Sequence, residues 1–370
     1  MFISLAQGAN QPDKEKAHKF TCPSCGATQE FEPKDNCLVC PYCGNKEDIP
    51  TSIETIKEHS YEKYLNSEHF QKIVLTENAL EVTCSACNAT VTFPPSEVAG
   101  ECAFCGTKIV AQTKSANPML APESLLPFKI TQSEATNSVK KWISNRWFAP
   151  NALKKFATQN TIGGVYLPFW TYDSYTTSYY KGERGEHYQV TENYTENGET
   201  KTRTITKTRW YSASGTISQW FDDVLIPATR SVEQSSLDRL SPWDLANLNA
   251  YNPAYLSGYK AQCYQINLQE GFEKAKSVMD TEIRSSVRKD IGGDEQRIST
   301  LTTSHSAITF KHILLPVYLA SYWFNQKIYQ VMVNARTGEV QGERPYSVVK
   351  IVLFILMILA IIAVLYYLFR

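Results

Sequence analysis

The sequence lacks the motifs that mark the common catalytic centres. It contains no G-x4-G-K-[ST] phosphate loop, no HExxH helix and no G-x-S-x-G turn, and its six histidines show no metal-ligand spacing. These absences remove the usual basis for helicase, ATPase, zinc-protease or serine-hydrolase activity. We therefore expect that the chain is not an enzyme. A buried cluster of carboxylates with perturbed pKa values in the middle of the chain would instead favour an unrecognised active site.

Arginine is missing from the first 145 residues. Residues 1–115 carry 10 Lys and 15 Asp or Glu, a balance of −5 that the remainder offsets, so that the formal net charge of the whole chain is zero. Phosphate backbones are bound by Lys and Arg, and the local charge therefore argues against nucleic acid as a partner. A nucleic-acid-binding protein of transcription or replication, tethered to a membrane, is the alternative function.

The N-terminus lacks the basic region and apolar run of a signal peptide. The other end of the chain is different, because residues 351–369, "IVLFILMILAIIAVLYYLF", form a run of 19 residues without a charge. A helix of that length is about 28 Å long, close to the thickness of a hydrocarbon core. We predict a transmembrane helix over 348–369. Since only Arg370 follows it, we expect a tail-anchored, single-pass protein of the cell membrane.

Nine of the ten cysteines lie before residue 106, and eight of them form C-x-x-C pairs. The stretches 21–46 and 83–108 align at an offset of 62 positions, and both read C-x2-C-x14-C-x2-C. This spacing is typical of zinc sites. The predicted ligands are Cys22, Cys25, Cys40 and Cys43 in the first copy and Cys84, Cys87, Cys102 and Cys105 in the second. Cys37 aligns with Ala99, which excludes a register that uses Cys37. It is then a spare thiol near the zinc site, either packed or redox-sensitive.

Two C-x-x-C turns direct four thiolates at one point and complete a tetrahedron around Zn²⁺. No coordination position stays open, so we expect two structural zinc ions; iron uses the same ligands and stays an alternative metal. Gly26 and Gly44 each follow a pair, where we expect a positive φ. Because metal-binding thiols must stay reduced, we place the N-terminal body in the cytoplasm.

The middle of the chain is predicted to be α+β. Thr131 and Glu134 form a capping box ahead of an apolar stripe at Ala135, Val139, Trp142 and Ile143. A second helical stripe consists of Leu268, Phe272, Ala275, Met279, Ile283 and Val287. Each helix precedes an aromatic strand with a Leu-Pro pair, at 167–168 and 315–316, which suggests two halves of helix plus antiparallel sheet. We expect Trp142 and Trp147 to lie in the core and Cys263 to be a buried thiol in a strand-like run.

A basic segment between these halves, "HYQVTENYTENGETKTRTITKTRW", contains Asn197-Gly198, a strong two-residue hairpin signal. Pairing around this turn places acidic or aromatic residues opposite basic ones and Val190 opposite Ile205. The predicted pairs with a basic member are Glu186 with Arg209, Tyr188 with Lys207, Glu192 with Arg203, and Tyr194 with Lys201. A self-paired, solvated hairpin is therefore favoured over a nucleic-acid-binding ribbon.

The whole layout resembles the membrane-anchored double zinc-ribbon proteins of bacterial phage-shock and envelope-stress clusters, the YdjG type. The resemblance rests on the tandem knuckles, "GVYLPFWTYD", "VNARTGEVQGERPYS" and the apolar C-terminal run. The knuckles alone also resemble TFIIB-like and primosomal-type zinc ribbons. The resemblance to the YdjG type implies a membrane adaptor that recruits cytoplasmic partners, such as flotillin-like or PspA-like proteins.

The sequence thus predicts a series of four units. They are a first zinc ribbon (18–50), a second zinc ribbon (78–112), an α+β domain (120–345, with possible halves 120–230 and 255–345) and a transmembrane helix (348–369). The expected function is that of a tail-anchored protein-protein adaptor at the membrane, active in envelope stress, with no small-molecule substrate identified.

Overall fold

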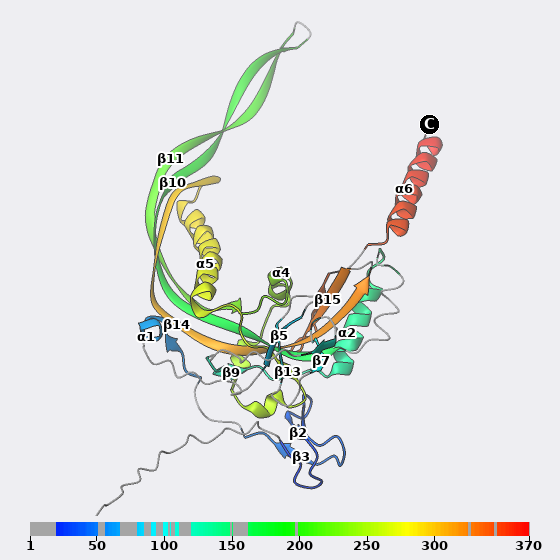
Figure 1. Ribbon diagram of the computed structural model, residues 1–370. Helices are drawn as coiled ribbons and strands as arrows, with labels where there is room; N and C mark the ends of the chain where they lie inside the picture. Colours follow the sequence, from blue (N-terminus) through cyan, green and yellow to red (C-terminus); the bar gives the residue numbers. More distant parts are fainter. Residues whose placement is uncertain are drawn as a thin grey trace, which may run out of the picture.

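The computed structural model describes residues 20–50, 56–66, 80–84, 90–93, 99–102, 104, 108–110, 120–148, 150, 162–196, 199–324, 327–343 and 346–369. These residues form one large, strongly curved antiparallel sheet with helices packed against it, several small sheets and a projecting C-terminal helix (Figure 1). The protein is therefore α+β, as predicted from the sequence.

The large sheet is built on three very long strands. Its main order is β11 (Glu199–Pro227), β10 (Gly163–Glu196), β14 (Glu295–Phe324), β15 (Lys327–Asn334) and β16 (Val340–Gly342), with every neighbour antiparallel. Short strands are added at β4 (His59–Ser60), β9 (Ser124–Leu125), β12 (Asn249–Ala250) and β13 (Lys260–Ala261). Segments from between residues 59 and 342 thus meet on one sheet.

Two helices cover the sheet as the apolar stripes predicted. Helix α2 (Gln132–Ser144) begins with the capping box of Thr131 and Glu134 and packs against β15 and β16. Helix α5 (Leu268–Ile291) buries its whole predicted stripe and packs against β11, β10 and β14. Shorter helical turns are α1 (Tyr61–Asn66), α4 (Gln234–Asp238), η1 (Leu245–Asn247) and η2 (Pro253–Leu256).

Alternate residues of the central strands enter different parts of the core, because successive side chains of a strand point to opposite faces. Leu167 and Leu315 pack in one cluster with Phe104, whereas Tyr166 and Leu314 pack in another with α2 and with Phe31. Residues of the first and second cysteine-rich segments therefore contact opposite faces of the sheet. A third cluster joins α5 to the parts of β10, β11 and β14 that include Tyr172, Phe221 and Phe310.

The cysteine-rich segments form small sheets. The first is a three-stranded antiparallel sheet of β1 (Glu30–Glu32), β2 (Cys37–Val39) and β3 (Lys46–Asp48). The second contains two separate pairs, β5 (Leu80–Thr83) with β6 (Thr90–Phe93) and β7 (Ala99–Glu101) with β8 (Lys108–Val110). Two tandem ribbons and a repeat in the α+β domain stay predictions.

The β10–β11 hairpin has the predicted register at all five pairs, from Tyr194 opposite Lys201 to Glu186 opposite Arg209. The pairing of β10 with β14 ends at Gly185 opposite Glu295. Beyond that pair the hairpin continues alone over residues 186–196 and 199–209, which we call the arm. At about 3.4 Å per residue it projects roughly 37 Å from the sheet, and Figure 1 shows it reaching away from the body.

Two sequence expectations are wrong. Trp147 does not lie in the core, because 75% of it is exposed beyond the end of α2. Its partner in that expectation, Trp142, is partly buried against the first core cluster. Cys263 lies outside any strand and is half-buried. The apolar stripe of α2 ends at Ile143, and this explains why residue 147 is not buried with it.

Candidate metal centre and membrane helix

Two tight turns present the first four predicted ligands. In each turn a glycine amide donates back to the carbonyl of the first cysteine, Gly26 to Cys22 and Gly44 to Cys40, both at 2.9 Å. Gly26 has φ of 76° and Gly44 has φ of 74°, as the sequence predicted. This left-handed conformation suits glycine because no Cβ opposes it, and it lets both cysteines of a turn face the same side.

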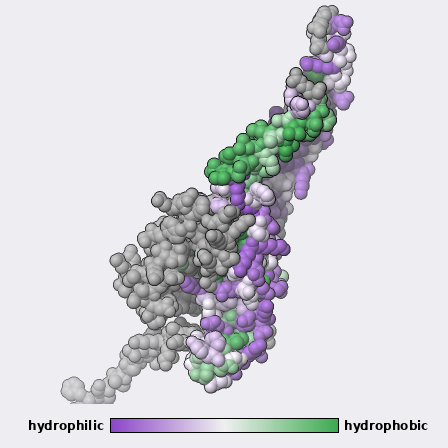
Figure 2. Space-filling view, turned by 90° about the vertical axis from the view of Figure 1, so that its right-hand side faces the viewer, coloured by the Kyte–Doolittle hydropathy of each residue, from purple (hydrophilic) through white to green (hydrophobic). Residues whose placement is uncertain are grey.

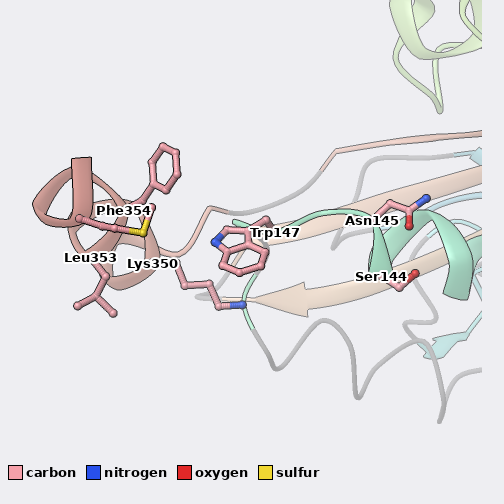
Figure 3. A pocket seen from close by; sticks show the side chains of 7 residues that line it. Ser144, Asn145, Trp147, Lys350, Leu353 and Phe354 are labelled. Carbon is pink, nitrogen blue, oxygen red and sulfur yellow. The ribbon is translucent and has the colours of Figure 1, made fainter. Parts of the chain in front are cut away.

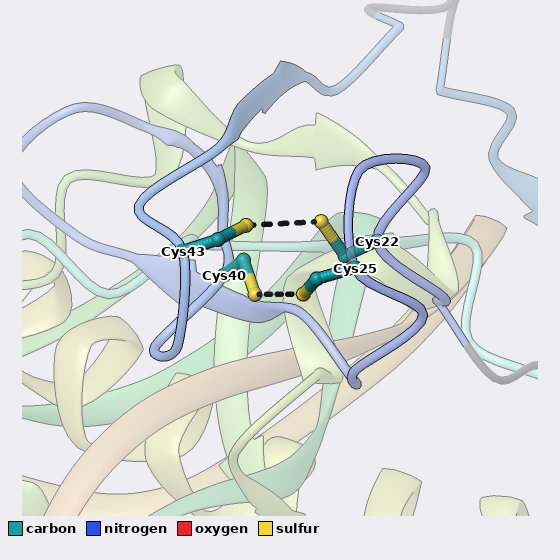
Figure 4. A group of neighbouring side chains, drawn as sticks. All are labelled: Cys22, Cys25, Cys40 and Cys43. Carbon is teal, nitrogen blue, oxygen red and sulfur yellow. Dashed lines mark hydrogen bonds between the residues drawn. The ribbon is translucent and has the colours of Figure 1, made fainter.

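The four Sγ atoms of Cys22, Cys25, Cys40 and Cys43 lie within 4.8 Å of one another. Figure 4 shows the two turns facing each other, with Cys22 and Cys43 at 3.5 Å and Cys25 and Cys40 at 3.5 Å. Sulfurs bound to one zinc ion at about 2.3 Å are separated by about 3.8 Å in a tetrahedron. The group therefore has the size and the chemistry to hold a metal ion.

The protonation of these thiols depends on their close packing. Hydrogen bonds from the backbone amide of Cys43 lower the pKa of Cys40 to about 6. The amide of Asn45 lowers the pKa of Cys43, but the thiols of Cys22 and Cys25 outweigh it and raise that pKa to about 12. Four thiolates at this spacing repel one another, so a bound cation is needed for all of them to ionise together.

Cys37 is not part of this group. It begins β2, where it pairs with Glu32 and Asp48, and only 4% of it is exposed. Burial raises the pKa of its thiol, and the carboxylate of Asp35 adds to the effect. A thiol of this kind stays protonated at neutral pH and packs as a small apolar side chain.

The first cysteine-rich sheet is fixed to the body by its apolar side. Phe31, Leu38 and Ile49 are buried in the cluster that also contains Tyr255 of η2. The rings of Phe31 and Tyr255 are 5.2 Å apart in an edge-to-face arrangement. The amide of Phe31 also donates to the carbonyl of Ser257 at 3.0 Å. The turn that carries Cys43 faces outward, with Tyr42 82% exposed.

Half of the second predicted ligand set can be placed. Cys84 and Cys102 are buried at 1% and 2% exposure and pack beside Phe104 against the large sheet. The amide of Phe104 donates to the Sγ of Cys102 at 3.4 Å. Cys87 and Cys105 lie outside the described residues. The structure therefore places only the first cysteine of each C-x-x-C pair in this second set.

A buried ion network, which the sequence did not reveal, joins the segment between the two cysteine-rich units to the large sheet. Lys311 of β14, 8% exposed at its side chain, binds Glu58 at 3.0 Å and Asp223 of β11 at 2.7 Å. Asp173 of β10 accepts hydrogen bonds from the Asp223 amide at 2.7 Å and the Thr309 hydroxyl at 2.6 Å. It sits at the irregularity where the β10–β11 register shifts between Tyr172 and Ser174.

Burial and charge act in opposite directions within this network. Burial raises the pKa of Asp173, which is 1% exposed. Burial alone would lower the pKa of Lys311, but the carboxylates of Asp223 and Glu58 raise it. Lys311 in turn lowers the pKa of Glu58 despite that residue's partial burial. Such a cluster is compatible with two roles. It can be a structural lock, meaning an ion network that fixes residue 58 and its neighbours to the sheet, or it can supply the perturbed carboxylates of an active site.

The C-terminal helix α6 (Val348–Leu368) is long and apolar enough to cross a membrane. The helix has 21 residues, and an 18-residue stretch of it has a mean hydropathy of 3.3. None of that stretch is buried against the body. Figure 2 shows it as a continuous hydrophobic surface. Exposed Tyr346 lies before it and exposed Tyr366 and Tyr367 near its end, an arrangement typical of the aromatic residues at the two membrane interfaces.

Comparison with known proteins gives one distant relative. The chain is 25% identical over 255 residues, 66% of its length and 70% of the relative's, to the uncharacterized protein YdjG of Bacillus subtilis (strain 168). No family model matches the chain. No solved structure matches it.

Proposed function

We propose that the protein is a membrane-tethered adaptor whose zinc-binding units and α+β domain recruit other proteins to the bilayer. One observation carries the proposal: a closed four-cysteine group and an unburied apolar helix belong to the same folded chain. Four thiolates around one ion leave no position for a substrate, which supports structural sites at both predicted ligand sets. The helix supplies the attachment to the membrane.

The outward-facing first cysteine-rich unit supports a role in protein binding. Its buried side is used to dock on the body, whereas the turn with Tyr42 is exposed. Exposed aromatic side chains are enriched at protein interfaces. Envelope stress as the setting, and flotillin-like or PspA-like proteins as partners, rest on the resemblance that the sequence motifs carry.

The orientation in the membrane is argued from the thiols. A metal site of four cysteines needs a reducing compartment, so the body would lie in the cytoplasm and α6 in the cell membrane. Among the described cysteines none is in a disulfide, and that agrees with this orientation.

Nucleic-acid binding is the weaker alternative. Three cations of the arm have partners within it. Glu192 pairs with Lys207 at 2.8 Å and with Arg203 at 3.6 Å. The guanidinium of Arg209 lies over the ring of Tyr188 at 4.9 Å. Cations that are matched in this way contribute less to phosphate binding than cations without partners.

An enzymatic function has one observation in its favour, the buried network of Lys311, Asp223 and Asp173. Both oxygens of Asp173 and the ammonium of Lys311 are occupied by neighbouring groups, and this supports a structural lock over a reactive centre.

The adaptor proposal is tested by comparing the full chain with the fragment 1–345. The full chain should need detergent for extraction, and the fragment should leave the membrane fraction. Affinity purification of the full chain from membranes should recover partner proteins that are lost after zinc chelation. The fragment's persistence in membranes after a high-salt wash would contradict the single anchor, and partners that are insensitive to chelation would contradict the role of zinc.

A further inference from the structure

A cavity of about 430 Å³ lies between the end of α2 and the first turns of α6. Figure 3 shows Asn145 and Trp147 on one side and Lys350, Leu353 and Phe354 on the other. The volume falls within the range of small-molecule sites, roughly 300–1,000 Å³. The function proposed above does not use this cavity.

Direct contacts hold the two walls together. The amide of Ser347 donates to the carbonyl of Phe148 at 2.8 Å. The rings of Phe148 and Phe354 are 5.3 Å apart at an interplanar angle of 77°. Ser347 also caps α6 by accepting from the amide of Lys350 at 3.4 Å. The start of α6 is thus placed by the residues that follow α2.

The α6 wall is a single helix face with a gradient of polarity. Lys350, Leu353, Phe354 and Met357 line the cavity, and steps of three, four and seven residues put all of them on one side of a helix. A cation stands at the start of this face, and three apolar side chains follow over about 10 Å. The face therefore matches a molecule with an anionic end and an apolar chain.

The position of the cavity relative to the membrane agrees with this polarity. If α6 spans the bilayer, Lys350 lies near the interface and Leu353 to Met357 enter the hydrocarbon. Trp147, 75% exposed, is then at interfacial depth, where tryptophan is enriched. The nearby end of α2 adds Lys140, Lys141 and Arg146, and residues 135–148 contain no Asp or Glu.

We propose that this cavity binds one anionic phospholipid of the surrounding bilayer. Its phosphate would lie at Lys350, and the upper part of an acyl chain would lie along Leu353, Phe354 and Met357 beside Trp147. This inference rests on the proposed membrane anchorage by α6. Bound in this way, the lipid would fill the space between anchor and body and hold α2 at the membrane surface.

The test uses the full chain, extracted in mild detergent, with native mass spectrometry to count the phospholipids that stay bound. The wild type should keep one phospholipid, and Leu353→Trp, which fills the cavity, should lose it. Leu359→Trp is the matched control because six residues further along the helix its side chain lies on the side opposite the lining face. It should keep the lipid.

Equal retention by all three proteins would overturn the proposal, since it would indicate only non-specific lipid around the helix. A change of oligomeric state in Leu353→Trp without lipid loss would also overturn it, because a second copy of α6 would then occupy the cavity. Failure of the proposed membrane anchorage is detected by a different measurement, membrane fractionation. If α6 did not insert, the full chain would leave membranes without detergent.

The headgroup is tested in nanodiscs of equal parts phosphatidylglycerol and phosphatidylcholine. One lysine near an anionic surface contributes about 1 kcal/mol, or about fivefold in binding. The wild type should enrich phosphatidylglycerol by about that factor, and Lys350→Gln should lose the enrichment. Lys289→Gln on α5 should keep it. Equal binding of the two lipids by the wild type would contradict an anionic ligand.

Discussion

Leu167 of β10 and Leu315 of β14 lie directly opposite each other, and neither side chain is exposed to solvent. Each belongs to one of the two Leu-Pro pairs that suggested an internal repeat. Helix α2 of the predicted first half packs on β15 of the second, and α5 of the second packs on β11 of the first. Because α5 also packs on β14 of its own predicted half, the two halves share one core, and the repeat stays a prediction.

Leu167→Ala should destabilise the protein by about 2–5 kcal/mol, because it leaves a cavity at the centre of the sheet. Thr191→Ala in the exposed arm is the control and should change stability by less than about 0.5 kcal/mol. Chemical denaturation of the fragment 1–345 measures both. A small effect at Leu167 would contradict its central position.

Leu315→Ala should have a similar cost, and the double variant should differ from the sum of the single ones. Residues in contact through one core commonly show coupling of about 0.5–3 kcal/mol. Strict additivity would indicate that the two side chains do not share a packing site.

Cys43→Ser should remove about one zinc ion per chain and unfold residues 20–50, whereas Cys37→Ser should keep the metal. Zinc-coupled folding contributes roughly 10–16 kcal/mol in small modules, but loss of a packed thiol costs about 0.5–3 kcal/mol. Metal analysis with limited proteolysis separates the two. Zinc loss from Cys37→Ser with retention in Cys43→Ser would reverse the assignment.

Lys311→Met should destabilise the protein because it leaves Asp223 and Glu58 without their cation. The cost should be below the roughly 3–5 kcal/mol of a fully buried pair, since the carboxylate of Glu58 is partly exposed to solvent. Lys289→Met, at an exposed site on α5, should have little effect. Thermal unfolding of the two variants measures the difference. A stabilised Lys311→Met protein would contradict the structural lock and favour the enzymatic alternative, because active sites commonly reduce stability.

His312 should make the protein less stable in mild acid. Burial lowers its pKa, and its Nδ1 lies 3.0 Å from the carbonyl of Leu120. A group with a lowered folded-state pKa contributes stability above its unfolded pKa of about 6.5, and that stability is lost as the pH falls toward the folded value. Denaturation at about pH 7.5 and about pH 5.5, on either side of the unfolded pKa, should show a smaller loss of stability for His312→Gln than for the wild type.

His59 acts in the opposite direction and is the internal control. Glu123, 2.9 Å away, raises the pKa of His59. Its stabilising effect is therefore present at low pH and is lost as the pH rises through the folded value. His59→Gln should steepen the loss of stability in acid, and an identical slope in both histidine variants would contradict these assignments.

The sequence predicted those parts of the fold that depend on local chemistry. The Asn197-Gly198 pair is a local hairpin signal in the sequence, so the pairing of Val190 with Ile205 in the arm followed from counting outward from it. The capping box and the stripe of α5 were equally local. The spacing of Cys22, Cys25, Cys40 and Cys43 likewise predicted which sulfurs come together.

Features that depend on distant segments were not predicted. Glu58 meets Lys311 across 253 positions, and no local pattern marks either residue. The docking of Phe31 beside Tyr255 and the burial of Phe104 against the sheet have the same origin. Trp147 was predicted to lie in the core because the sequence around a helix end does not distinguish a buried aromatic side chain from an exposed one. Its position beside α6 depends on a segment about 200 residues further along the chain.

The connections of β14 have a consequence for the order of folding. This strand pairs with β4, β9, β10 and β15, and its residues Thr309 and Phe310 pair with Ser60 and His59 of β4. During synthesis the β10–β11 hairpin can close early, because its two strands are adjacent in the chain. The edge of β10 that awaits β14 stays open until about a hundred more residues have been added. Such non-local pairing slows folding and exposes an unpaired edge, so the nascent chain should depend on chaperones until β14 is made.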